Sequence, residues 1–189
     1  MSENSEKYRR AIGGFSAVVD SVAPEKWSAP SPCEGWTARH VVGHVIGGTQ
    51  MISVAQTGQP PDYGDPVATA GDDPAASFGK ARDLALSTLT DEFLTKKVPS
   101  PMGEMPVDQI LGMFLTNDIV IHTWDLAQAA GVPVELDPQL VDEAYNALVR
   151  VDDMIRQPNL FGPKIEPPGG ADPTTRLMCF VGRQPTRAG

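Results

Sequence analysis

Two of the three histidines in this chain occupy positions typical of a metal site. His44 lies within VVGHVIGG, and His122 follows Asp118 by four residues in NDIVIHTWDLA. A histidine and a carboxylate four residues apart on a helix share one face, with Cβ atoms about 5–6 Å apart, which suits joint coordination of one ion. His44, Asp118 and His122 are therefore the first candidates for chemistry.

The elements that carry these residues are expected to be helices. Long periodic stretches alternate with breaks rich in proline and glycine, a pattern that favours helices joined by irregular connections. The pattern predicts helices over residues 5–22, 37–56, 74–96 and 107–130, a surface crossing over 58–73, and a short turn or hairpin over 98–106. Thr37 is the expected N-cap of the second helix, and Gly131 the expected end of the fourth.

The fourth predicted helix is apolar almost all round, as a helix buried in a bundle would be. Asp118 and His122 fall in the same stripe as Leu111 and Leu115. A carboxylate there is costly unless it is paired, hydrogen-bonded or bound to a cation.

The second predicted helix places His44 and His40 differently. His44 lies at the flank of its apolar face, whereas His40 is rotated about 40° further towards solvent at 100° per residue. His44 is thus the better ligand, and His40 the better surface residue. Gly43, Gly47 and Gly48 leave little bulk beside His44 and would let a neighbouring helix or a ligand come close.

Composition narrows the class of protein. The chain has 189 residues, 41% of them hydrophobic, and we expect a single domain over residues 1–189 with its own core. A net charge of −9 argues against nucleic acid as a partner.

The polar N-terminus and the lack of long apolar runs predict a cytoplasmic protein without a membrane partner. Cys33 and Cys179 are expected to be reduced thiols.

These patterns alone leave alternatives open. A histidine beside an acid on a helix is also typical of an ordinary hydrogen-bonded pair, and no HExxH motif is present. Asp125, one turn after His122, either orients the His122 ring or is a solvated acid near the helix end. Cys33 either lies in a packed loop in which Trp36 covers the bundle end, or is a nucleophile activated by the following helix.

The order GWTARHVVGHVIGG, NDIVIHTWDLAQAAG and TTRLMCFVGRQP covers most of the chain and resembles the DinB-like metalloenzyme superfamily. The resemblance is to the actinobacterial branch similar to the N-terminal domain of mycothiol-dependent maleylpyruvate isomerase. It implies an all-α fold: an up-down-down-up four-helix bundle with an additional C-terminal helical segment. It also implies that His44, Asp118 and His122 bind a divalent metal, usually zinc, with nickel or iron as alternatives.

Three features depart from the family pattern. The family usually has glutamate in place of Asp118, and commonly a carboxylate in place of His40. The isomerase carries an extra C-terminal domain that helps to hold its thiol, and the residues after Gly131 are expected to be too few for an equivalent.

Two histidines and one carboxylate leave coordination positions open, as in catalytic rather than structural metal sites. The favoured function is a metal-dependent enzyme, a thiol S-transferase or isomerase, that activates mycothiol or another low-molecular-weight thiol towards a small-molecule substrate. The alternatives are a metal-hydroxide hydrolase and a non-catalytic protein that binds or sequesters a metal or ligand. An exposed bundle face makes a homodimer a reasonable expectation.

Overall fold

The computed structural model describes residues 1–57, 64–100, 103–156 and 160–184. The chain divides into two compact units, Met1–Val134 and Glu135–Gly189. Helices dominate the described residues, and the sheet found among them has two strands. The predicted all-α class is therefore confirmed, while the single domain over residues 1–189 stays a prediction. Within the described ranges, no helix is both long enough and apolar enough to cross a membrane.

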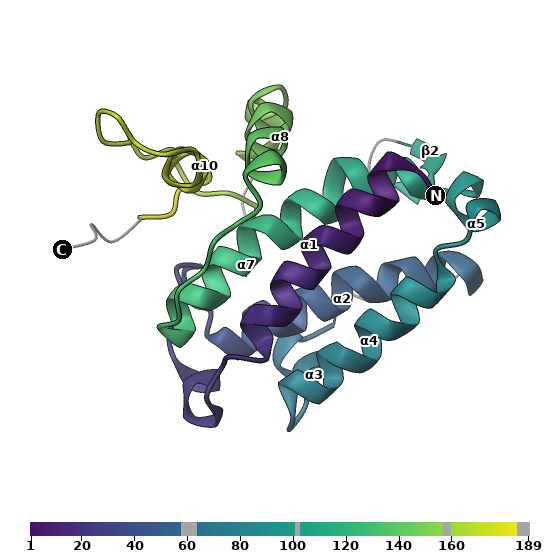
Figure 1. Ribbon diagram of the computed structural model, residues 1–189, viewed down its shortest axis with the longest axis horizontal. Coiled ribbons are helices and arrows are strands. Elements are labelled where there is room, and N and C mark those ends of the chain that lie inside the picture. Colours follow the sequence, from purple (N-terminus) through teal and green to yellow (C-terminus); the bar gives the residue numbers. More distant parts are fainter. Residues whose placement is uncertain (58–63, 101–102, 157–159, 185–189) are drawn as a thin grey trace. The chain divides into compact units, whose positions relative to one another are not determined.

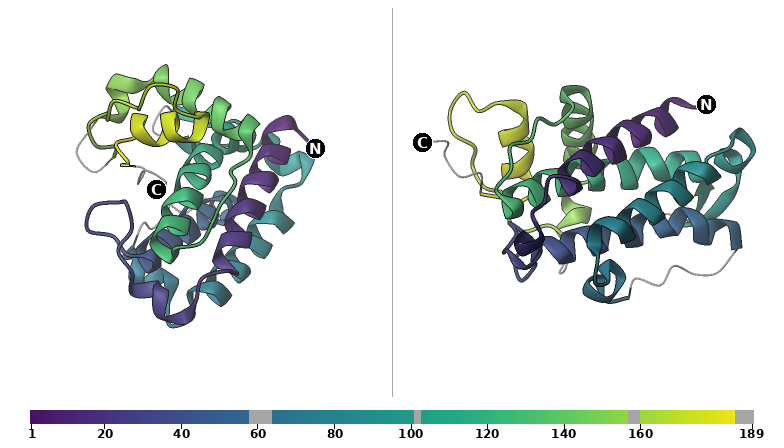
Figure 2. Two further views of the ribbon diagram at one scale, coloured as in Figure 1. Left: turned by 60° about the vertical axis from the view of Figure 1, so that its left-hand side comes forward. Right: turned by 60° about the horizontal axis from the view of Figure 1, so that its bottom comes forward.

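The first unit is built on four long helical segments (Figure 1). They are α1 (Glu3–Val19), α2 (Ala38–Thr57), α4 (Pro74–Thr88), and a continuous segment made of α6 (Val107–Ile110), a π-helical turn (Leu111–Leu115) and α7 (Thr116–Ala130). In Figures 1 and 2, α1 and α7 run in one direction and α2 and α4 in the other. This is the predicted up-down-down-up order.

Shorter elements connect the long helices. They are a 3₁₀ turn (Pro24–Ser28), α3 (Pro66–Ala70), α5 (Asp91–Thr95), and the strands β1 (Lys97–Ser100) and β2 (Gly103–Pro106). The strands pair antiparallel, with Lys97 opposite Pro106 and Ser100 opposite Gly103. The predicted hairpin is therefore present.

Capping residues explain where the predicted boundaries hold and where they fail. Gly131, with φ of 72°, ends α7 as predicted. The first helix ends at Val19 rather than at residue 22. The third predicted helix breaks after Thr88, because the Thr90 hydroxyl accepts the backbone N–H of Phe93 at 3.2 Å and starts α5.

The predicted crossing over residues 58–73 is only partly irregular. Residues 58–63 lie outside the described part of the chain, and α3 occupies part of the rest. Asp65 begins α3 by accepting the backbone N–H of Val67 at 3.0 Å, with Pro66 in the first turn. This short helix was not predicted from the sequence; the Asp65 cap and Pro66 start it within a stretch rich in proline and glycine.

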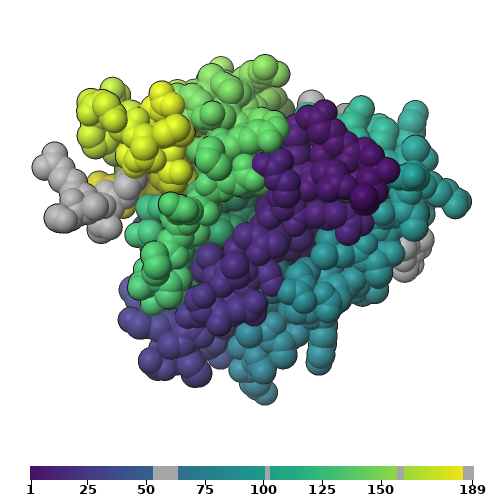
Figure 3. Space-filling model, in the orientation of Figure 1, coloured from purple at the N-terminus to yellow at the C-terminus, as the bar shows by residue number. Residues whose placement is uncertain are grey.

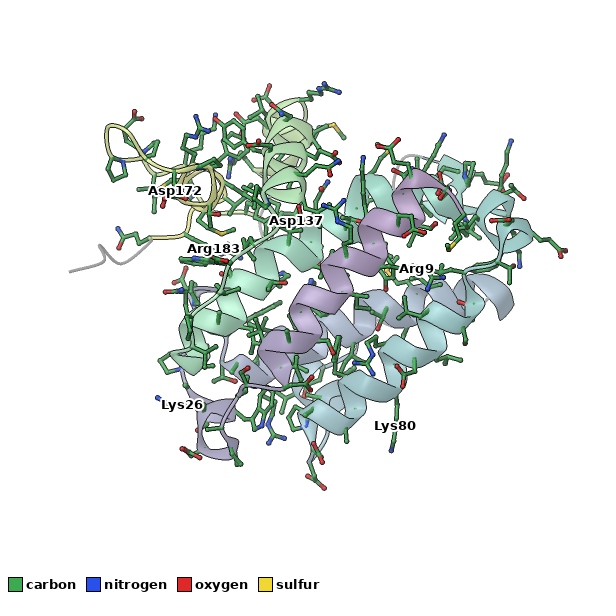
Figure 4. All side chains as sticks on the ribbon, viewed as in Figure 1. Arg9, Lys26, Lys80, Asp137, Asp172 and Arg183 are labelled. Atoms are coloured by element: carbon green, nitrogen blue, oxygen red, sulfur yellow. The ribbon has the colours of Figure 1, made fainter. Side chains whose placement is uncertain are left out.

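The core of the first unit lies between α1 and its neighbours. Tyr8, Ile12, Phe15 and Val19 recur at helical spacing and are almost fully buried. The Phe15 ring lies 5.0 Å from the ring of Phe78 on α4. Figure 3 shows α1 lying between α7 and α4 on this face, and Figure 4 shows Arg9 on the side of α1 towards α4. The Arg9 guanidinium donates to the carbonyl of Leu86 at 3.5 Å.

A π-helical turn precedes the candidate site on the fourth segment. It contains Gly112, where an added Cβ would lie 2.4 Å from the side-chain oxygen of Asn4 on α1. Asn4 also donates to Asp108 at 2.9 Å, so α1 and the start of this segment are held side by side. The regular 100° step does not carry across a π turn. The predicted angular relation of Asp118 to Leu111 and Leu115 is therefore not that of an ideal α-helix.

The second unit contains α8 (Pro138–Val149), α9 (Asp152–Ile155) and α10 (Pro173–Phe180). The rings of Tyr145 on α8 and Phe180 on α10 lie 5.5 Å apart. The Arg156 guanidinium lies 4.8 Å from the Phe180 ring and pairs with Asp152 at 3.0 Å. These contacts hold together the C-terminal helical segment that was expected after the bundle.

At Gly43, next to His44 on α2, the backbone of α3 approaches closely. A Cβ added at Gly43 would lie 1.8 Å from the carbonyl oxygen of Pro66, so the two backbones can meet only at a glycine. Arg39, one turn earlier on α2, donates to the carbonyl of Gly71 at the end of α3. The α2–α3 contact thus fixes the part of α2 that carries His44.

We predict that Gly43→Ala lowers the free energy of unfolding by roughly 1–3 kcal/mol, because the methyl group forces the α3 backbone away. Gly47→Ala is the matched control on the same helix, since nothing lies within 4 Å of its added Cβ. It is expected to be neutral or to stabilise by up to about 1 kcal/mol. Chemical denaturation measures both, and equal effects would contradict the proposed α2–α3 contact.

Candidate metal centre

Helices α2 and α7 bring the three predicted ligands together. Nε2 of His44 lies 3.2 Å from Oδ1 of Asp118, and Nε2 of His122 lies 3.4 Å from the same oxygen. One donor atom from each side chain falls within 4.8 Å of the other two. The spacing of four residues therefore places Asp118 and His122 on one face of α7, as predicted, and His44 reaches Asp118 from the neighbouring helix α2.

The three side chains differ in their access to solvent. Those of His44 and Asp118 are 38% and 31% exposed, whereas that of His122 is only 8% exposed. A small molecule would therefore reach the cluster from the side of His44 and Asp118. The Trp36 ring stacks on His122, with centroids 5.8 Å apart and planes 20° apart, and lies 5.2 Å from His44.

Asp125 lies behind His122. Its Oδ2 is 3.0 Å from Nδ1 of His122, and its side chain is completely buried. Of the two predicted roles, a solvated acid is therefore wrong, and the contact is the one that orients the ring. A carboxylate that accepts a hydrogen bond from one nitrogen of a histidine fixes the orientation of the ring. It also makes the other nitrogen more basic, and so a better ligand for a metal ion.

The electrostatics of the cluster are dominated by Asp118 and His122. Burial by itself would raise the pKa of Asp118, but the charges and hydrogen bonds of His122 and His44 outweigh it and hold that pKa well below its ordinary value. For His122 burial acts in the opposite direction and by itself would lower the pKa, because it disfavours the charged imidazolium. The carboxylate of Asp118, then hydrogen bonds to Asp118 and Asp125, raise it well above its ordinary value.

The raised pKa of His122 agrees with the positions of its two ring nitrogens, each of which faces a carboxylate. Without a cation, the His122 ring must carry a proton on both nitrogens to donate to Asp118 and to Asp125. A divalent ion at Nε2 would take the place of the forward proton and leave the bond to Asp125 intact. The cluster is thus arranged to hold positive charge between Asp118 and the two imidazoles.

A tight turn before α2 delivers Cys33 and Trp36 to the cluster. The backbone N–H of Trp36 donates to the carbonyl of Cys33 at 3.0 Å, and Gly35 within the turn has φ of 76°, a conformation that favours glycine. The Cys33 thiol donates to Oδ2 of Asp125 at 3.1 Å. Sequence reasoning missed this contact, because the two residues are 92 positions apart.

His40 has a local structural role. Its Nδ1 accepts the backbone N–H of Thr37 at 3.1 Å and lies 2.8 Å from the Thr37 hydroxyl. His40 occupies the third position of α2, where a capping box usually has glutamate or glutamine that accepts this same N–H. The ring is half-buried and stacked near Trp36 rather than directed freely into solvent, and it is not part of either potential ligand cluster found among the described residues.

The donor separations from Asp118 can be compared with those expected around a tetrahedral divalent ion. Ligand bonds of about 2.0–2.2 Å at tetrahedral angles separate two donor atoms by about 3.3–3.5 Å. The observed separations from Asp118 to His44 and His122 are 3.2 and 3.4 Å. Cys33, His122 and Asp125 form a second cluster, with hydrogen-bonded separations of 3.0 and 3.1 Å. The first cluster differs in being more open, since the side chains of His44 and Asp118 are 38% and 31% exposed while that of Asp125 is completely buried.

Comparison with known proteins identifies the chain's relatives. Two proteins described as uncharacterised, from Mycobacterium tuberculosis strains CDC 1551 and H37Rv, are each 29% identical to it over 180 residues, covering 93% of this chain and 95% of theirs. Two crystal structures of mycothiol-dependent maleylpyruvate isomerase share the fold. A histidine-to-alanine mutant has a TM-score of 0.53 at 19% identity, and the other structure 0.51 at 17%.

The structural match covers 75% and 78% of this chain, but 66% and 65% of the two isomerase chains. The family model described as the mycothiol maleylpyruvate isomerase N-terminal domain matches residues 8–127. That range includes all four long helical segments in whole or in large part, together with every residue of the cluster. The chain therefore belongs to the mycothiol maleylpyruvate isomerase N-terminal domain family.

Proposed function

We infer that the protein binds a divalent metal through His44, Asp118 and His122, and that it is an enzyme acting on a low-molecular-weight thiol of the mycothiol type. The observation that carries the metal proposal is the convergence of two imidazole nitrogens on one carboxylate oxygen, at 3.2 and 3.4 Å, with Asp125 held against the back of His122. Family membership supports the choice of a thiol.

The proposed metal is zinc, with nickel or iron as alternatives, because two histidines and one carboxylate suit all three ions. A divalent ion bound there would lower the pKa of a thiol that enters an open coordination position, and so supply a nucleophile at neutral pH. The transfer or isomerisation would then proceed on a small electrophile beside the exposed edges of His44 and Asp118.

The surrounding residues have distinct roles in this proposal. Asp118 supplies the negative charge that retains the cation, and Asp125 keeps Nε2 of His122 facing Asp118. Trp36 covers the His122 ring and limits the access of water from that side. The competing function is a metal-hydroxide hydrolase that uses the same ion. The two functions differ in whether an added thiol binds to the metal.

We predict that protein purified without a histidine tag contains about one equivalent of divalent metal per chain, as expected for a single mononuclear site. His44→Ala and His122→Ala should each lose most of it, and Asp118→Asn should weaken binding, since an amide is a poorer ligand than a carboxylate. Elemental analysis and chelator competition measure this. His40→Ala is the control, expected to keep both metal and fold. Full occupancy in both ligand-histidine variants would end the metal proposal.

A second prediction concerns the thiol. Adding mycothiol, or a simpler thiol, to cobalt-substituted protein should produce sulfur-to-cobalt charge-transfer absorption, because a thiolate would occupy an open position. Thiol transfer to a chlorinated or epoxide electrophile should then depend on the metal. An unchanged spectrum with every thiol, together with metal-dependent ester or amide hydrolysis, would replace the thiol reaction with the hydrolytic one.

A further inference from the structure

Cys33 contacts the cluster from outside the proposed ligand set. Its thiol donates to Oδ2 of Asp125 at 3.1 Å, and the same oxygen lies 3.0 Å from Nδ1 of His122. Asp125 is completely buried, and His122 is nearly so. A buried carboxylate needs donors on its lone pairs, so the position of Asp125 depends on what surrounds it.

We propose that Cys33 is a positioning residue of the metal centre, acting through Asp125 on His122, and that covalent modification of its thiol weakens metal binding. This inference rests on the proposed metal site. Cys33 and His122 share one oxygen of Asp125, so the thiol helps to fix the point from which that carboxylate holds the ring. Loss of the thiol would remove one of the donors that position Asp125 and let Nε2 of His122 turn away from Asp118.

Cys33 is the more exposed of the two cysteines. It is partly exposed, in the turn before α2, while the other cysteine, Cys179, is buried in the C-terminal unit. An adduct on Cys33 would remove the S–H donor and place new bulk against Asp125. The reagent class is any thiol-directed electrophile: alkylation forms a carbon–sulfur bond, and the thiol proton and the leaving group depart.

The first test is a double-mutant cycle on Zn²⁺ affinity, measured by chelator competition. Asp125→Asn is expected to weaken Zn²⁺ binding roughly 10–100-fold, as loss of a partner behind a histidine ligand does. Cys33→Ala is expected to weaken it roughly threefold to tenfold, the effect of one modest hydrogen bond. If Cys33 acts through Asp125, Cys33→Ala has little further effect in the Asp125→Asn background. Additive effects would overturn the proposal.

Conservative and neighbouring variants separate positioning from general damage. Cys33→Ser retains a hydroxyl donor and should restore most of the affinity lost in Cys33→Ala. Glu34→Ala alters an exposed residue of the same turn and should leave affinity unchanged. The visible spectrum of the Co²⁺-loaded protein should change in Cys33→Ala and not in Glu34→Ala, because it reports the geometry of the ligands. Unchanged affinity and spectrum in a folded Cys33→Ala protein would overturn the proposal.

Alkylation provides the same comparison if Cys33→Ala fails to fold. Iodoacetamide should modify Cys33 of the folded protein, as shown by mass spectrometry of its peptides, and release Zn²⁺ to a chelating dye. Cys179 should remain unmodified, and treated Cys33→Ser should keep its Zn²⁺. Retention of Zn²⁺ by protein fully alkylated at Cys33 would overturn the proposal.

Failure of the metal site itself would look different. Wild-type protein would then bind no Zn²⁺ or Co²⁺ at all, and the inference about Cys33 would fall with it. If instead the wild type binds metal and only the cycle is additive, the metal site stands and Cys33 has no positioning role.

Discussion

Two carboxylates on one apolar helix must be stabilised, and the bundle is arranged around that requirement. Asp118 and Asp125 lie on α7, the first 31% exposed and the second completely buried. Removing a carboxylate from water is costly unless charge or hydrogen bonds replace the hydration. His122 lies between them and meets each with one nitrogen. The His122 imidazole thus links the buried carboxylate of Asp125 to the partly exposed carboxylate of Asp118, and Asp125 determines its orientation.

The remaining elements bring donors to these two anions. The antiparallel approach of α2 places His44 opposite Asp118, and the turn before α2 places Cys33 against Asp125. The parallel course of α2 and α4 leaves α3 beside the N-terminal half of α2, where Gly43 lets the two backbones meet. Two contacts therefore hold the part of α2 that carries His44: the contact of Gly43 with α3, and the contact of the preceding turn with α7. The geometry of the cluster depends on this packing.

Much of this arrangement could be predicted from the sequence. Periodicity of apolar residues located the four long helical segments, and Gly131 ended the last one, because these signals are local. The spacing of Asp118 and His122 defined one face of α7 for the same reason. Pairing of that face with His44 needed the family resemblance, since no local pattern specifies which helices become neighbours.

Other features could not be predicted, because they depend on contacts distant in sequence. The π turn at Leu111–Leu115 lies where Gly112 meets Asn4 of α1, and nothing within the segment itself signals that approach. The contact of Cys33 with Asp125 spans 92 positions, and it becomes visible only when the turn is folded against α7. His40 was assigned to the surface from its angle, although its capping contact with Thr37 is local and could have been found from the position alone.

The short side chain of Asp118 sets a further geometric condition. With one methylene fewer than glutamate its carboxylate has a shorter reach, so both imidazoles must come close to the α7 backbone. Gly47 and Gly48 do not set this approach: an added Cβ at Gly48 would lie 3.7 Å from the Leu115 side chain, an ordinary van der Waals distance, and one at Gly47 would meet no other atom within 4 Å. Gly43 is the position beside His44 where glycine is required, because an added Cβ there would lie 1.8 Å from the carbonyl oxygen of Pro66. The geometry of the cluster therefore depends on the α2–α3 contact next to His44 together with the short reach of the Asp118 carboxylate from α7.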